Sequence, residues 1–385
     1  MLRLCIVLFF LQCCSLRLTA QDSVLINLLV RRIALQQVDR DNQFFSKGNF
    51  PSYISNSANF RTTKKDNNVF FNALIHYTLS ICYDFLSQQN RFNIDSVRRQ
   101  SALLYPKFKN RKDRITYNFW RTDSAYVFPY TSWIHLIKKN TALPDDMDDT
   151  VLSLMAQNAD TASAAAAHLV MQQYVNKQKG AKSIEKKYRQ YEAYSVWYGK
   201  DFPPVFDVCV LSNVLSFVQQ YHLQWTTADS AGLQVIIQAV KSGDYQTKPL
   251  LVSPYYGNTS VILYHLARLM SIKKIPQLEE LKTSLITTAV QQFAAADNSL
   301  EKIILSTAIM KWGYVPPVLN LPQEDEFLKA VEQNDLPFFI GNIPSYFPSF
   351  YKRLFTQKNW LLFYHYCPAY NDVLLLEYLL LKQNL

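Results

Sequence analysis

The sequence predicts an all-α fold, an (α/α)6 toroid in which six helical hairpins close into one ring. Apolar residues recur at helical spacing, and only 8 glycines occur in 385 residues, too few for a fold with many tight turns. The expected helix starts lie 58, 51 and 40 residues apart, about the length of one helical hairpin with its loops. These starts are Asp149, Asp207, Asn258 and Asn298. Six such hairpins fit residues 21–385 as a single domain.

The first twenty residues have the pattern of a cleavable secretory signal peptide. Arg3 precedes an apolar run over residues 4–11, and Ala20 stands at the expected cleavage position. The run is too short for a transmembrane anchor. Two cysteines near its end leave lipidation as an alternative. The sequence therefore predicts that residues 1–20 are removed and that the protein is exported to the periplasm or the cell exterior.

The expected mature chain is basic and poor in cysteine. Removing residues 1–20 lowers the net charge from +10 to +8. The positive charges form short polar runs, at 61–65, 107–114 and 182–189, which are typical of solvated loops or helix faces. We therefore expect no nucleic-acid partner. Three cysteines allow at most one intramolecular disulfide and leave its formation open. They are Cys82, Cys209 and Cys367.

Apolar spacing also predicts the other helices in chain order. They cover residues 23–37, 67–86, 94–105, 161–174, 182–192, 322–336 after a polar start, and 371–381. A Ser- and Asn-rich loop is expected over residues 47–66, and residues 344–362 form an aromatic-rich tail. The last helix is very apolar but too short to span a membrane, so we assign it to the core.

Four carboxylates crowd five consecutive positions before an apolar helix: Asp145, Asp146, Asp148 and Asp149, directly after Pro144. One acid is enough to cap a helix. In a partly buried site the acids repel one another, which raises the pKa of at least one. A carboxyl that keeps its proton is a general acid, and a tight carboxylate cluster is also a Mg²⁺ site. Helix capping alone is the third interpretation.

The letters DMDDT at positions 146–150 resemble the D-x-D-D-T motif of class II terpenoid cyclases, which are built on α/α toroids. At the level of architecture the resemblance covers roughly residues 67–312. It implies that Asp148 protonates an isoprenoid double bond. It also implies that Asp146 and Asp149 hold Asp148 in the hydrogen-bonded state that this step requires.

Two further resemblances imply a metal. The same letters fit D-D-x-x-D through Asp145, Asp146 and Asp149, similar to the motif with which class I terpene synthases bind magnesium diphosphate, and this implies Mg²⁺. An Asp-x-Cys followed by a distant His is similar to the Zn²⁺ site of protein prenyltransferase β subunits, another α/α-toroid family. The residues of that pattern are Asp207, Cys209 and His265. The alternative is a capping aspartate beside an inert buried cysteine.

Aromatic residues stand directly upstream of the acids. Ring faces stabilise carbocations, so Trp120, Tyr130 and Trp133 are candidates for the lining of a substrate cavity. The same rings also suit a hydrophobic core.

Two functions follow from these patterns. The first is proton-initiated cyclisation of an isoprenoid or other hydrophobic small molecule, with Asp148 as the general acid. The second is a noncatalytic or glycan-processing toroid of the cell envelope, since paired carboxylates also hydrolyse glycans. A deep apolar cavity beside Asp148 favours the first, and a shallow polar groove with two facing carboxylates favours the second.

Overall fold

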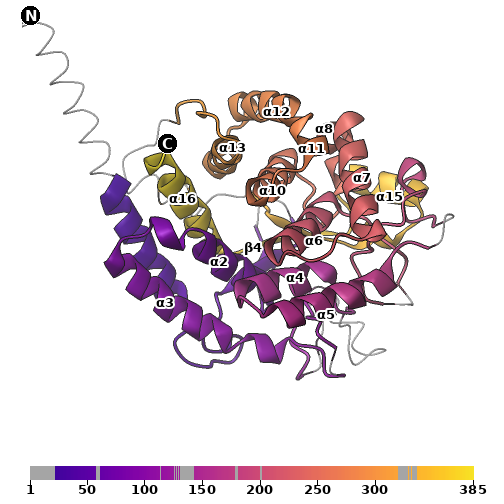
Figure 1. The fold of residues 1–385 in the computed structure, drawn as a ribbon. Coiled ribbons are helices and arrows are strands. Elements are labelled where there is room, and N and C mark those ends of the chain that lie inside the picture. The colour runs from indigo at the N-terminus through magenta and orange to yellow at the C-terminus, as the bar shows by residue number, and fades with distance from the viewer. Residues whose placement is uncertain are drawn as a thin grey trace, which may run out of the picture.

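A computed structural model gives the fold (Figure 1). It describes residues 22–57, 61–112, 114–124, 126, 128, 130, 143–177, 181–199, 202–319, 328, 331 and 336–385. The expected signal peptide, Trp133 and most of the helix expected over residues 322–336 lie outside the described residues.

The described chain is mostly helical, as the sequence predicts, and it also contains a small antiparallel sheet that the sequence did not predict. The helices are α2 (Phe70–Ile81), α3 (Gln88–Ala102), α4 (Met147–Ala156), α5 (Thr161–Met171), α6 (Val208–Gln220), α7 (Thr227–Lys241), α8 (Asp244–Thr247), α9 (Pro249–Val252), α10 (Thr259–Ile272), α11 (Pro276–Glu279), α12 (Lys282–Ala295), α13 (Ser299–Lys311), α15 (Ser349–Gln357) and α16 (Pro368–Gln383). The strands are β1 (Ser52–Ser55), β2 (Thr63–Asp66), β3 (Phe339–Asn342) and β4 (Leu362–Tyr366). Residues 22–36 are also helical.

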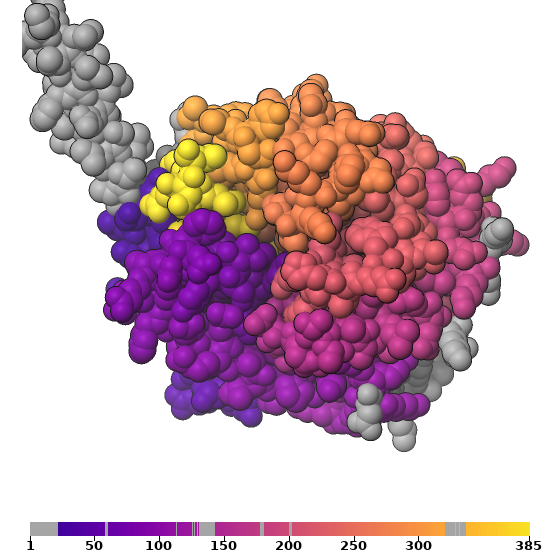
Figure 2. All heavy atoms as spheres, in the orientation of Figure 1, coloured from indigo at the N-terminus to yellow at the C-terminus, as the bar shows by residue number. Residues whose placement is uncertain are grey.

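Six helices contact one another in a closed cycle. Helix α2 contacts α4, α4 contacts α6, α6 contacts α10, α10 contacts α13, α13 contacts α16, and α16 contacts α2 again. Most of their residues are buried, and helices α3, α5, α7 and α12 lie at the periphery against members of the cycle (Figure 1). Figure 2 shows the closure from outside, where the yellow C-terminal residues lie beside the purple N-terminal ones.

Side-chain caps fix where four helices of the cycle begin. The caps of α4, α6, α10 and α13 each accept a backbone N–H from the first turn, and they are Asp146, Asp207, Asn258 and Asn298. The last three are the predicted starts. The start predicted at Asp149 is wrong, because the carboxylate of Asp146 accepts the N–H of Asp149 at 2.8 Å and caps the helix.

The sheet has the order β2-β1-β4-β3, and every neighbouring pair is antiparallel. It joins distant parts of the chain, since His365 of β4 lies opposite both Ile54 of β1 and Phe339 of β3. The predicted loop over residues 47–66 is therefore wrong, because β1 and β2 form within it. Strands of four or five residues are too short to show a period of two.

The helix predicted over residues 182–192 is also wrong, because this segment holds only a short 3-10 turn, Lys186–Tyr188. The first two carbonyl groups of the segment bond to α15 instead of to a helix of their own. The carbonyl of Lys182 accepts the N–H of Ser349 at 2.7 Å, and the carbonyl of Ser183 accepts the ammonium group of Lys352.

All three cysteines of the described chain, Cys82, Cys209 and Cys367, are buried and free. None of the helices that the structure describes has both the length and the apolar character needed to cross a membrane.

Candidate functional site

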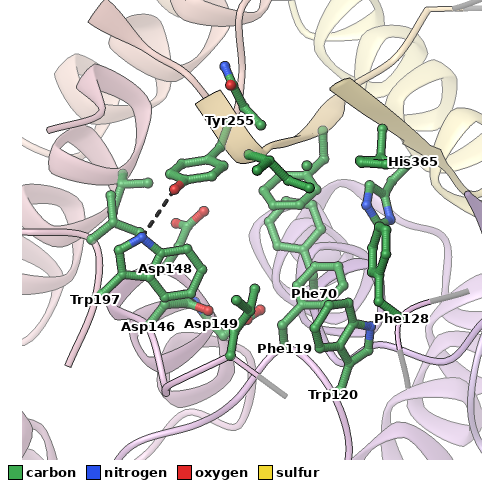
Figure 3. A pocket seen from close by; sticks show the side chains of 18 of the residues that line it. Phe70, Phe119, Trp120, Phe128, Asp146, Asp148, Asp149, Trp197, Tyr255 and His365 are labelled. Atoms are coloured by element: carbon green, nitrogen blue, oxygen red, sulfur yellow. Dashed lines mark hydrogen bonds between the residues drawn. The ribbon is translucent and has the colours of Figure 1, made fainter. Parts of the chain in front are cut away.

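A cavity of about 250 Å³ lies between the starts of several helices of the cycle and the sheet (Figure 3). Its lining includes Phe70, the first residue of α2, Val210 in the first turn of α6, and Tyr255 just before α10. Three acids from the start of α4, Asp146, Asp148 and Asp149, also line it. Residues of β3 and β4 and of the segment that follows β3 complete the lining. The described lining is mostly aromatic and aliphatic, so water competes weakly for polar contacts inside it.

Asp148 is buried on the acid wall and receives two hydrogen bonds. The amide of Asn213 on α6 donates to one carboxylate oxygen at 2.6 Å, and the hydroxyl of Tyr256 donates to the other. Arg268 on α10 lies behind this pair and donates to the Asn213 side-chain oxygen at 2.5 Å. Burial raises the pKa of Asp148, while the two donors and the Arg268 charge counteract the increase.

Asp149 is buried on the same wall but lacks donors. Neither of its carboxyl oxygens accepts a hydrogen bond from any described N–H or O–H group. Burial, together with the neighbouring Asp146 carboxyl, raises the pKa of Asp149 well above its ordinary value. Burial also raises the pKa of Asp146 to about 7. The charges of these two neighbouring carboxyls interact, so Asp146 and Asp149 titrate as a pair and not independently.

Asp145, the fourth acid of the cluster, takes no part in the cavity lining. Its carboxylate accepts hydrogen bonds from Thr116 and Asn110, both at 2.5 Å, and lies 3.3 Å from the guanidinium of Arg114. These contacts fix the segment before α4 from behind. The carboxylates of the D-D-x-x-D pattern therefore do not converge on one wall, because Asp145 is bound on the other side of the backbone.

Aromatic rings face the acids across the cavity (Figure 3). Phe119 stacks on Phe339 with ring centroids 5.4 Å apart, and Phe70 lies 4.5 Å from Phe339. Trp197 stands beside the acids, where its indole N–H donates to the hydroxyl of Tyr255 at 3.1 Å. Ring faces of this kind attract cations.

A buried Asp–His pair also borders the cavity. Nδ1 of His365 lies 3.2 Å from the carboxylate of Asp66, and His365 is part of the lining. Although burial alone would raise it, the pKa of Asp66 is lowered by the hydrogen bond and charge of His365 and by the donors Asn68 and Trp120. The carboxylate therefore favours a proton on Nδ1, which leaves Nε2 as the basic nitrogen. Gly341 lies next to it, since a Cβ there would be 3.3 Å from Nε2.

Sequence reasoning missed this pair because nothing local marks it. Asp66 and His365 are 299 positions apart in the chain and meet only through the pairing of β1 with β2 and with β4. A lone aspartate and a lone histidine in short polar and aromatic segments give no spacing signal.

Of the three aromatic residues predicted to line the cavity, one does so, one lies elsewhere and one lies outside the described residues. Trp120 lines the cavity and stacks on Tyr126 with ring centroids 4.0 Å apart. Tyr130 is not part of the described lining, and its hydroxyl donates to the carbonyls of Ile54 and Thr62 at 3.2 Å. Trp133 lies outside the described residues.

The predicted zinc ligands serve other purposes. The carboxylate of Asp207 caps α6 and accepts hydrogen bonds from the hydroxyl of Ser253 at 2.5 Å and the N–H of Tyr255 at 2.8 Å. Cys209 is buried, and Nδ1 of His265 lies 2.8 Å from the carbonyl of Val261 in its own helix. Within the described ranges, no group of three or more His, Cys, Asp and Glu side chains is placed to hold a metal ion. We therefore derive no step through Mg²⁺ or Zn²⁺.

Comparisons of the chain with protein-family models, with curated proteins and with solved structures give no match.

Proposed function

We propose that the closed cycle of helices is an (α/α)6 toroid and that its cavity catalyses a proton-initiated cyclisation of an isoprenoid chain. The observation that carries the proposal is three buried carboxyls with raised pKa values, Asp146, Asp148 and Asp149, on one wall of an aromatic cavity. A raised pKa favours the protonated form of a carboxyl, and the rings opposite these acids stabilise positive charge. A glycan needs more polar partners than this described lining offers, so we favour an apolar ligand.

In the proposed first step, Asp148 transfers its proton to a carbon–carbon double bond of the bound chain. The electron pair of that bond forms the new C–H bond and leaves a tertiary carbocation, which the next double bond attacks to close a ring. Asn213 and Tyr256 stabilise the carboxylate that remains on Asp148, since both donate to its oxygens. Asp149 has no such donors, which makes it the weaker acid of the two.

Asp146 and Asp149 have a supporting role in this proposal. A proton held by either of these two carboxyls keeps that carboxyl neutral, so that the reacted wall does not carry three negative charges. This lowers the repulsion that the new carboxylate of Asp148 meets.

His365 ends the proposed reaction. It lies across the cavity from Asp148 (Figure 3), and its Nε2 accepts a proton from the carbon next to the last carbocation, which forms the product double bond. Asp66 stabilises the imidazolium that results. Solvent then takes this proton from His365 and returns one to Asp148, so the product is an isomer of the substrate.

Product analysis in D₂O tests the proposal. The purified protein is incubated with polyprenyl alcohols and diphosphates of increasing length, and with squalene, and the extracts are analysed by mass spectrometry. We expect cyclic products that carry one deuterium from the initiating acid. Asp148→Asn should lower the rate roughly a thousandfold. Asp160→Asn is the matched control, because Asp160 is an exposed helix cap on α5. Cyclisation without deuterium, or an unchanged rate in Asp148→Asn, removes Asp148 from the acid role.

A further inference from the structure

Helix α15 is amphipathic with its apolar side facing solvent. Phe350 is 74% exposed, Tyr351 53% and Leu354 44%, whereas Lys352 and Thr356 on the other side of the helix are buried. In a helix that packs on a protein core the arrangement is the reverse. The apolar side of α15 therefore lacks a partner within the described chain.

Polar contacts fix the buried side of α15, and Phe355 also packs edge-on against Phe347 with ring centroids 5.4 Å apart. The ammonium group of Lys352 donates to the carbonyl of Ser183, and the guanidinium of Arg353 pairs with Glu185. The N–H of Ser349 donates to the carbonyl of Lys182 at 2.7 Å. These contacts keep the exposed aromatic residues turned outward.

The turn after α15 extends the apolar surface. Trp360 is 54% exposed and Leu361 is 43% exposed. Asn359 and Leu361 both have positive φ angles, 52° and 60°, a conformation that is rare for leucine.

Basic groups lie next to this surface. The ammonium group of Lys358 lies 4.6 Å from the centre of the Trp360 ring. A hollow next to α15 is lined by four basic and two acidic side chains, and one of the basic residues is Arg353 of α15. They are Lys186, Lys187, Lys248, Arg353, Glu185 and Asp244. The surface thus combines exposed Phe, Tyr, Trp and Leu with an excess of positive charge.

We propose that α15 and the turn over residues 358–361 bind the interface of an anionic lipid bilayer. Aromatic side chains prefer the depth of the lipid headgroups, and lysine and arginine attract anionic headgroups. A second copy of the chain is a poorer occupant, because a symmetric contact would place basic groups opposite basic groups. This inference does not depend on the proposed cyclisation, since it uses none of the cavity residues.

Quenching of tryptophan fluorescence by brominated lipid tests the proposal locally. The full chain is mixed with vesicles of brominated phosphatidylcholine, with or without phosphatidylglycerol, and Trp360→Phe identifies the signal of Trp360. We expect Trp360 to be quenched in the anionic vesicles, with apparent affinity at least about tenfold weaker without phosphatidylglycerol or at high salt. Phe350→Ser with Leu354→Ser should weaken binding about tenfold or more, and Lys358→Glu should weaken it in the anionic vesicles.

Phe92→Ser is the matched control, because Phe92 is 67% exposed on α3. It should leave the quenching of Trp360 unchanged. All variants keep the same N-terminal residues, so their differences report this surface alone. The proposal is overturned if Trp360 is not quenched, or if the α15 variants are quenched like the unchanged chain. It is also overturned if size-exclusion chromatography shows a dimer that these variants dissociate.

Discussion

Asp66 and Asp149 are buried to the same extent, each 1% exposed, yet their pKa values are shifted in opposite directions beside one cavity. Asp66 accepts hydrogen bonds from Asn68, Trp120 and Tyr126 and contacts His365, and its pKa is lowered. Asp149 has no described donor, and its pKa is raised. Burial alone therefore does not decide which carboxyl keeps its proton. Hydrogen-bond donors and His365 lower the pKa of Asp66 on the sheet side, whereas Asp149 on the helix side lacks such donors and its pKa is raised.

Removing the charge on the sheet side should have the largest effect on stability. In Asp66→Asn, an amide N–H₂ group faces hydrogen-bond donors that previously donated to the carboxylate. His365 also loses its counter-charge. We expect unfolding free energy to fall by about 3 kcal/mol, measured by urea denaturation at pH 7. Asp160→Asn should change it by less than about 0.5 kcal/mol, because asparagine caps a helix equally well.

The stability lost in Asp66→Asn should also depend on pH. The lowered pKa of Asp66 means that its stabilising contribution is present above the ordinary value of 3.8 and is lost on acidification. The difference between the unchanged chain and Asp66→Asn should therefore shrink as pH falls below 4. A difference that grows in acid would contradict the ionised state of Asp66.

The contribution of the helix side to stability should depend on pH in the opposite way. The pKa of Asp146 is raised from 3.8 to about 7, so the folded state binds the extra proton and stability declines as pH rises between these values. Asp146→Asn keeps the helix cap but removes the titration. We expect the stability of the variant to decline less steeply, by about 1.4 kcal/mol per pH unit. If the stability of the two proteins changes equally steeply between pH 4 and 7, Asp146 has an ordinary pKa in the folded state.

The smallest expected effect concerns the space beside His365. In Gly341→Ala the new Cβ lies 3.3 Å from Nε2 of His365 and 3.4 Å from Cβ of Phe363, which is tight but not prohibitive. We expect a loss of about 1 kcal/mol of stability or less. The rate of product formation should fall more clearly, because the methyl group crowds the proposed base. Unchanged turnover would place the accepting nitrogen elsewhere.

The helix side of the site could be predicted because its signals are local. Asp207, Asn258 and Asn298 cap helices where the sequence indicated, since a cap residue acts on the backbone two or three positions later. The acids were found because they are adjacent in sequence. That Asp145 points away from the cavity while Asp149 lines it depends on Thr116 and Asn110, which donate to Asp145. No spacing pattern in the sequence links these two residues to the acids.

The sheet side could not be predicted in the same way. Its strands are four or five residues long and come from both ends of the chain, so their pairing is a tertiary event. The prediction of a helix over residues 182–192 was wrong for a related reason. Residues of α15 donate hydrogen bonds to the carbonyl groups of Lys182 and Ser183. Both failures occur where distant segments supply the hydrogen bonds.

We infer that the helix side of the cavity holds a protonated carboxyl at neutral pH. Infrared difference spectroscopy detects such a carboxyl without any substrate. We predict a carbonyl stretching band of a protonated carboxylic acid at pH 7 that disappears or weakens in Asp149→Asn and persists in Asp160→Asn. Absence of the band at pH 7, or a band that Asp149→Asn leaves unchanged, would contradict the account.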